Sequence, residues 1–120
     1  MTKVLVVDDS PSEMAKFREL LSKHDFEIIE ANNGELGCQL AIDEQPDVVL
    51  MDIVMPEMNG FQATRKIAKC IETSHIPVVI VSTKNQETDR VWGKRQGAKA
   101  YLTKPVTEPE LLDAIRSVME

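Results

Sequence analysis

Short apolar runs alternate along this chain with longer stretches in which apolar positions recur every three or four residues. The first run, residues 3–7, is continuous and ends at two acidic residues, as is typical of a strand buried on both faces of a parallel sheet. Met14, Phe17 and Leu21 follow at spacings of three and four residues, which places them on one face of a helix. The chain therefore begins with a strand and a helix that packs against a sheet.

Two capping boxes mark the start of helices. In Ser10-Pro-Ser-Glu13, Ser10 is expected to accept a hydrogen bond from the amide of Glu13, and the Glu13 side chain to return one. Proline also suits the first position of a helix. The segment Thr107-Glu-Pro-Glu110 has the same form and predicts the start of the last helix.

The same alternation of strand and helix continues to the end of the chain. Strands are predicted at 3–7, 27–30, 47–51, 77–81 and 100–102, and helices from Ser10, at 34–43, 60–69 and 86–96, and from Thr107. Short connections between such units imply right-handed crossovers, with helices on both faces of a parallel sheet. A closed barrel needs about eight units. We therefore expect an α/β fold with an open, doubly wound (βα)5 sheet, in one domain spanning residues 1–120 and without a separate output domain.

Composition and charge exclude several classes of protein. Apolar residues make up 42% and charged residues 28% of the chain, which is the balance of a globular domain. The net charge of −6 argues against nucleic-acid binding, which relies on basic side chains that displace counterions from phosphates. The sequence contains neither a signal peptide nor an apolar run long enough to span a membrane, so we expect a cytoplasmic location without membrane association. Cys38 and Cys70 lack ligand spacing and are expected to be buried free thiols.

Polar side chains follow the predicted strands at the edge where open α/β sheets bind ligands. They are Asp8, Asp9, Asp52, Ser82, Thr83 and Lys104. Each alone is a common turn or cap residue. Three carboxylates at one edge, however, repel one another unless a cation joins them, and a few carboxylates with waters and a phosphate suit Mg²⁺. An aspartate can attack a phosphoryl group while a metal and a lysine neutralise its oxygens, and Asp52 and Lys104 fit these roles.

Four motifs, LVVDDS, VVLMDIVMPEMNG, IPVVIVST and AYLTKP, occur in this order over the whole chain. Together they resemble the response-regulator receiver family, whose members are CheY-like. The resemblance implies a flavodoxin-like sheet with strand order 2-1-3-4-5 and a cis peptide bond between Lys104 and Pro105. Within the family, DIVMPEMNGFQATR and DRVWGKRQGAKAYLTKP are most similar to the PilH type of regulator from type IV pilus chemosensory systems.

The resemblance also implies a role for each site residue. Asp52 is the expected phospho-acceptor, and Lys104 is expected to pair with the phosphoryl group. Mg²⁺ is expected at Asp8, Asp9, Asp52 and the Val54 backbone carbonyl, with Asp8 holding a ligand water. Ser82 occupies the hydroxyl switch position and Tyr101 the aromatic switch position.

The implied function is that of a stand-alone response regulator in a two-component phosphorelay, in twitching motility or chemotaxis-like signalling. A sensor histidine kinase would donate the phosphoryl group to a monomer. An output or motor protein would then bind the face formed by the fourth helix, fifth strand and fifth helix, where Arg90, Lys94 and Arg95 add positive charge. Such a domain is not an enzyme, apart from weak autophosphatase activity.

Two other functions are compatible with part of these sequence features. A small phosphatase or phosphotransferase would use the same metal and nucleophile, but the chain has no segment for a substrate-binding cap. A flavodoxin-like flavin carrier shares the sheet, but two acids follow the first strand, where they would repel a phosphate. Within the receiver pattern, Val54 and Lys84 are unusual and are expected to lengthen the life of the phosphorylated form, and the simplest interpretation of Trp92 is ordinary packing.

Overall fold

The computed structural model describes residues 1–120 and confirms the alternation of strands and helices. The strands are β1 (Thr2–Val7), β2 (Phe26–Ala31), β3 (Val48–Met51), β4 (Val78–Ser82) and β5 (Ala100–Thr103). The helices are α1 (Pro11–Ser22), α2 (Gly34–Glu44), α3 (Gly60–Lys69), α4 (Glu87–Arg95) and α5 (Glu108–Met119). Every predicted boundary lies within one residue of the observed one. None of these helices has the length and apolar character needed to cross a bilayer.

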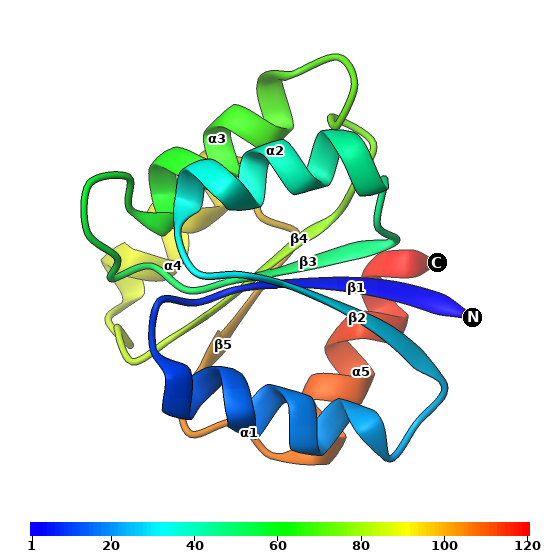
Figure 1. Cartoon of the computed structure of the whole chain (residues 1–120). Helices are drawn as coiled ribbons and strands as arrows, with labels where there is room; N and C mark the ends of the chain where they lie inside the picture. The colour runs from blue at the N-terminus through cyan, green and yellow to red at the C-terminus, as the bar shows by residue number, and fades with distance from the viewer.

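The strands form a single parallel sheet in the order β2-β1-β3-β4-β5, which confirms the doubly wound topology. Figure 1 shows α1 and α5 on one face of this sheet and α2, α3 and α4 on the other. Because all strands run in the same direction, their carboxyl ends lie at one edge. The residues that follow the strands are therefore brought together, although they are far apart in the sequence.

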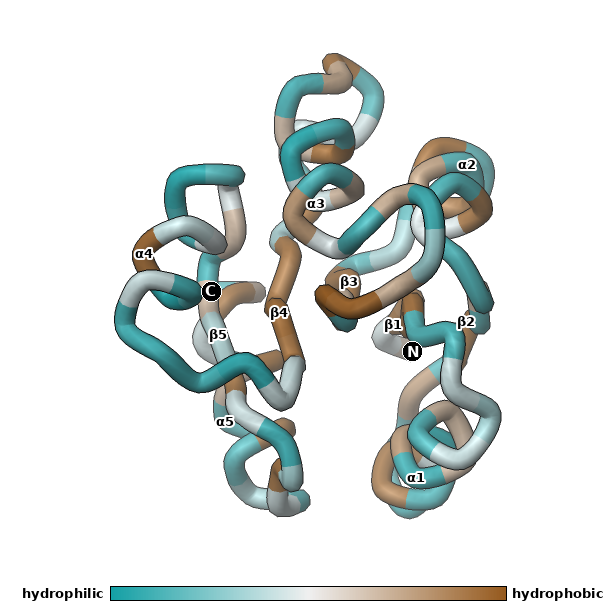
Figure 2. The backbone as a smooth tube through the Cα atoms, turned by 90° about the vertical axis from the view of Figure 1, so that its left-hand side faces the viewer, coloured by the Kyte–Doolittle hydropathy of each residue, from teal (hydrophilic) through white to brown (hydrophobic).

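The hydrophobic core consists of two layers, one on each face of the sheet. Alternate residues of a strand point to opposite faces, so Val4 and Val6 pack with α1 and α5, whereas Leu5 and Val7 pack with α2 and α3. Figure 2 shows the apolar colouring concentrated in the strands, with mixed colouring along the helices. A smaller third cluster of Ile53, Ile80, Ala98 and Tyr101 lies beside α4.

The start of α1 differs from the prediction in one bond. The Ser10 hydroxyl accepts from the amide of Glu13 at 3.3 Å, as expected. The amide of Ser10, however, donates to Asp8 Oδ1 at 2.9 Å rather than to Glu13. The Glu13 carboxylate is instead attracted to two ammonium groups, those of Lys16 at 3.2 Å and Lys104 at 3.5 Å. The second box is confirmed in full, because both bonds between Thr107 and Glu110 are present.

The two cysteines are free thiols, as expected. Cys38 is buried among the residues between α2 and the sheet, and this burial raises the pKa of its thiol. Cys70, at the end of α3, is only half-buried, because it lies where the chain leaves the helix. The prediction of burial is therefore correct for Cys38 and wrong for Cys70.

Gly60 determines the shape of the loop between β3 and α3. Its amide donates to the Ile53 carbonyl at 2.8 Å, which brings the start of α3 back against the end of β3. A Cβ atom at this position would overlap the backbone carbonyl of Asp52. Only glycine allows the two backbone segments to approach this closely, so Gly60 helps to fix the position of Asp52.

We expect Gly60→Ala to lower the free energy of unfolding by about 3 kcal/mol, because backbone cannot move aside as a flexible side chain can. Urea unfolding followed by circular dichroism measures this change. Gly34→Ala is the matched control, since a methyl group there would lie 3.0–3.2 Å from Met58, a tight contact that a shift of a few tenths of an ångström relieves. Equal losses in the two variants would contradict a special constraint at Gly60.

Candidate functional site

Asp8 and Asp52 lie side by side because the sheet pairing continues past the ends of β1 and β3. Val7 pairs with Met51 in the register of the two strands, so the next residues, Asp8 and Asp52, are also neighbours. Their backbone amides extend the ladder, that of Asp8 donating to Ala31 and that of Asp52 to Val7, both at 3.0 Å. The backbone therefore holds these two carboxylates at adjacent positions.

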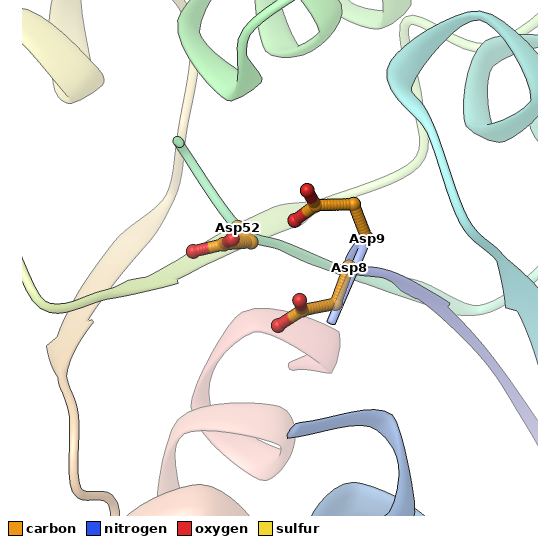
Figure 3. A group of neighbouring side chains, drawn as sticks. All are labelled: Asp8, Asp9 and Asp52. Atoms are coloured by element: carbon orange, nitrogen blue, oxygen red, sulfur yellow. The ribbon is translucent and has the colours of Figure 1, made fainter. Parts of the chain in front are cut away.

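Asp9 completes a cluster of three carboxylates. One ligand oxygen from each of Asp8, Asp9 and Asp52 lies within 4.8 Å of the others. Figure 3 shows the three side chains approaching one another from the ends of β1 and β3. Asp8 is buried whereas Asp9 is exposed, so the cluster reaches the surface at Asp9. An arrangement of hard oxygen donors of this kind suits a divalent cation that keeps some of its waters.

Lys104 provides the positive charge beside these acids. Its ammonium lies 2.9 Å from Asp8 Oδ2 and 3.4 Å from Asp52 Oδ1. The lysine side chain is 9% exposed and that of Asp52 is 11% exposed, so these charges interact with little screening by water. The bond between Lys104 and Pro105 is cis, as the resemblance implied. The structure thus brings together four residues from the ends of three strands.

Burial and charge shift the pKa values of two groups in the site. Burial and the neighbouring Asp8 carboxylate raise the pKa of Asp52 to about 6, against the opposing effect of Lys104. Burial alone would lower the pKa of Lys104, but the hydrogen bond to Asp8 and the charge of Asp52 outweigh it and raise that pKa. At neutral pH, Asp52 is therefore mostly ionised and Lys104 fully charged.

The two predicted switch residues are connected through the backbone of Lys84. Ser82 is fully buried, and its hydroxyl oxygen accepts from the Lys84 amide at 3.2 Å. The Tyr101 side chain is turned inward, and its hydroxyl donates to the Lys84 carbonyl at 2.6 Å. Displacement of the Ser82 hydroxyl would therefore disturb the same residue that holds the Tyr101 ring.

Arg90, predicted to add positive charge to the face of α4, β5 and α5, is attached to β5. Its guanidinium donates to Thr103 Oγ1 at 2.8 Å and to the Tyr101 carbonyl at 3.3 Å. The same group lies 5.2 Å from the centre of the Tyr101 ring, in the geometry of a cation–π contact. Lys94 and Arg95 are exposed, as predicted. Arg90 thus links α4 to β5 because three groups on β5 attract its charge.

Trp92 and Val54 are both exposed side chains. Trp92 is 50% exposed, so packing alone does not account for it. Val54, two residues after Asp52, is 59% exposed and offers no polar group. Its neighbour Ile53 is buried and packs in the third apolar cluster, which leaves Val54 on the outside of the loop.

Sequence reasoning missed three contributors to the site. Glu13 was interpreted only as a capping residue, yet it pairs with Lys104 at 3.5 Å. The only signal for this pairing in the sequence is the position of Glu13 in the first turn of α1, the helix that follows Asp8 and Asp9. Gly60 was treated as a helix start, and its contact with the Asp52 backbone depends on the folded loop. The backbone of Lys84 likewise carries no signature in the sequence.

The doubly wound sheet and the acidic carboxyl edge define a small α/β domain of the CheY-like class. Residues 4–116 match the family model of the response regulator receiver domain, and the chain belongs to this family. Its structure superposes on the chemotaxis protein CheY4 of Vibrio cholerae with a TM-score of 0.91 and 29% identity, over 98% of both chains. The receiver domain of Thermotoga maritima CheB gives a TM-score of 0.89 and 32% identity, over 99% of this chain and 96% of that one.

Two relatives of known name align along nearly their whole length. Protein PilH of Pseudomonas aeruginosa is 60% identical over 119 residues, which cover 99% of this chain and 98% of the relative. The polar-differentiation response regulator DivK of Brucella anthropi is 33% identical over 97% of this chain and 94% of its own. The chain is thus a receiver domain similar to PilH, and a receiver is a signalling domain.

The raised pKa of Asp52 predicts a stability change that depends on pH. The folded protein holds the Asp52 proton more tightly than the unfolded chain does, so ionisation between about pH 4 and pH 6 destabilises the fold. Asp52→Asn cannot ionise. In metal-free buffer we expect this variant to be more stable than the wild type by about 2–3 kcal/mol at pH 8, and by almost nothing near pH 4.

Urea unfolding in the presence of a chelator at the two pH values measures this difference. Asp113→Asn, on the exposed surface of α5, is the control and should leave stability unchanged at both. A gain in Asp52→Asn that is the same at pH 4 and pH 8 would show that ionisation of Asp52 is not its cause.

Proposed function

We propose that this protein is a stand-alone response regulator that accepts a phosphoryl group on Asp52 from a sensor histidine kinase. The observation that carries the proposal is the ionised, largely buried Asp52 carboxylate beside the Lys104 ammonium at 3.4 Å and the Asp8 and Asp9 carboxylates. The alignment with PilH over nearly the full length of both chains supports a single-domain regulator. A cytoplasmic monomer suits such a role.

The donor set of the acidic cluster fits Mg²⁺. Asp8, Asp9 and Asp52 supply only oxygen atoms, and Lys104 alone leaves their charge incompletely balanced. We propose that these residues hold the ion together with the Val54 carbonyl, with Asp8 acting through a ligand water. A bound Mg²⁺ would supply positive charge to the phosphoryl oxygens.

Asp52 and Lys104 would have different roles in the transfer of the phosphoryl group. A carboxylate oxygen of Asp52 attacks phosphorus, the bond from phosphorus to the kinase histidine nitrogen breaks, and an acyl phosphate forms. Asp52 must be ionised for this attack, and its pKa of about 6 leaves it ionised at neutral pH. Lys104 stays charged throughout and stabilises the negative charge on the transferring oxygens.

The output step would pass through Ser82 and Tyr101. We propose that the Ser82 hydroxyl turns toward the phosphoryl group and that the change reaches Tyr101 through Lys84, whose backbone bonds both side chains. The surface of α4, β5 and α5 would then bind or release an output or motor protein. The similarity to PilH supports a place in type IV pilus or chemotaxis-like signalling.

Phosphorylation by acetyl phosphate tests the proposal directly. With Mg²⁺, the wild type should gain the mass of one phosphoryl group in an acid-labile linkage, and a chelator should prevent the gain. Asp52→Asn should not label, because it lacks the nucleophile. Asp113→Asn, an equal change on the surface, should label normally. Full labelling of Asp52→Asn would disprove the assignment.

Lys104→Ala separates labelling from the conformational response. Without the ammonium, the variant should still accept the phosphoryl group, although more slowly, since Asp52 remains present. Chemical-shift changes over α4, β5 and α5 should be lost, because Lys104 is the charge that senses the modification. Shift changes on phosphorylation that lie elsewhere in the wild type would contradict the proposed output face.

The side chains at Val54 and Lys84 should slow loss of the phosphoryl group. Hydrolysis requires a water held in line with phosphorus, and Val54 offers no hydrogen bond to orient one. We expect Val54→Asn and Lys84→Glu each to speed phosphate release from purified phosphoprotein several-fold. Val91→Asn places the same amide on α4 and should have no effect. Unchanged release in both test variants would show that these positions do not control the water.

A further inference from the structure

A hollow lies between α3 and α4, on the side of α4 that faces α3. Its lining residues are Asn59, Phe61, Gln62, Arg65, Trp92 and Gln96. The hollow has a volume of about 350 Å³, enough for one large side chain of a partner. Figure 2 shows α3 and α4 on the same side of the sheet, with β4 and β5 below them in this view. We call this feature the α3–α4 groove.

Trp92 is presented to this groove by the packing of α4. Gly93 is the only buried residue of the helix, and a Cβ atom there would lie 2.9 Å from Ile80 and 3.2 Å from the Tyr101 ring. The helix therefore contacts the sheet through Gly93, which turns the adjacent Trp92 outward, 50% exposed. Phe61 is half-buried against the Ile80 and Tyr101 cluster and forms the opposite side. Exposed tryptophan beside arginine is typical of the centres of protein interfaces.

The polar groups of the groove are hydrogen-bond donors. The side-chain oxygens of Asn59 and Gln62 accept from each other's backbone amides, both at 2.9 Å, in the capping box of α3. Their NH₂ groups remain available to a ligand, and the exposed guanidinium of Arg65 adds more donors. A ligand for this groove must therefore bring acceptors, of which carboxylates are the strongest.

The positive charge of the residues around the groove also favours an acidic ligand. Residues 60–106 contain nine Lys and Arg, of which Lys104 is buried in the acidic site, and only three Asp and Glu, although the whole protein has a net charge of −6. Helix α3 itself has three basic residues and no acidic one. This separation of charge attracts an acidic partner to α3 and α4 and directs it away from the remaining surface.

We propose that the α3–α4 groove binds an acidic segment of a partner protein, with an apolar side chain against Trp92 and Phe61 and carboxylates at Arg65 and the amide donors. A protein is favoured over a nucleic acid because the aromatic pair lines a hollow of about 350 Å³, the size of one large side chain, and the acidic remainder of the chain would repel a long polyanion. This site goes beyond the proposed phosphorylation switch. It does not require Asp52.

Fluorescence of Trp92, the single tryptophan of the chain, reports binding directly. The probe is a synthetic amphipathic peptide with leucines on one helical face and glutamates on the other. Titration into the wild type should shift the Trp92 emission to shorter wavelength and saturate, because the ring leaves water. Raised salt should weaken the binding. The same peptide with lysine for every glutamate should not bind.

Matched variants on one helix locate the site. Arg65→Glu should weaken peptide binding about tenfold. Lys66→Glu carries the same charge change on the next residue, which lines a different hollow beside α2, and should weaken binding much less than Arg65→Glu does. Asp52→Asn should bind as the wild type does, so a failure of phosphorylation and a failure of the groove give different results.

Three outcomes would overturn the proposal. The first is a titration without a saturable change in Trp92 emission at millimolar peptide, and the second is an equal loss of binding in Lys66→Glu and Arg65→Glu. The third is tighter binding of a single-stranded oligonucleotide or of anionic phospholipid vesicles than of the acidic peptide, which would assign the groove to another class of ligand.

Discussion

Repulsion among the carboxylates at the end of the sheet is the constraint on which the rest of the structure depends. The pairing of β1 with β3 places Asp8 and Asp52 at adjacent positions, where water is largely excluded. A single ammonium, that of Lys104, reaches both. The site is thus held with an excess of negative charge, and burial together with the Asp8 carboxylate raises the pKa of Asp52 to about 6. Such a site attracts cationic partners and is sensitive to any group added to Asp52.

Helix α4 is the element best suited to respond to that site. Gly93 is its only buried residue, so little apolar area holds it to the sheet. Its other attachments are polar or aromatic and converge on Tyr101, through the Arg90 guanidinium and the hydroxyl bond to Lys84. A helix held by a few such contacts can shift at small cost in free energy, unlike one packed into the core.

The two faces of α4 have different chemistry as a result. The side toward β5 carries Arg90 and borders the inward Tyr101 ring, next to the acidic site. The side toward α3 carries Trp92 and the donor groups of the groove, within the basic half of a protein that is acidic overall. One short helix therefore borders two separate surfaces, the proposed output face beside β5 and the groove beside α3, which would let two partners bind the same domain.

The sequence by itself determined the fold of this protein, because the evidence for it is local. Continuous apolar runs such as residues 3–7 indicate buried strands. Apolar residues spaced by three or four, such as Met14, Phe17 and Leu21, indicate helices. The alternation of the two predicts a parallel sheet. The candidate site was also predictable as a set, since strand ends of a parallel sheet must meet at one edge. The predicted ends of the strands and helices lie within one residue of the observed ends, because the signals that mark them are also local.

Only the tertiary structure decided which partner each charged or polar group takes. Glu13, predicted to cap α1, pairs instead with Lys104, and the Arg90 guanidinium binds groups on β5, because charges interact with groups that are distant in the sequence. The exposure of Trp92 follows from Gly93 packing against the sheet, and the need for Gly60 follows from a backbone contact with Asp52. Interactions of this kind depend on distances in three dimensions, and the local pattern of a sequence carries no information about those distances.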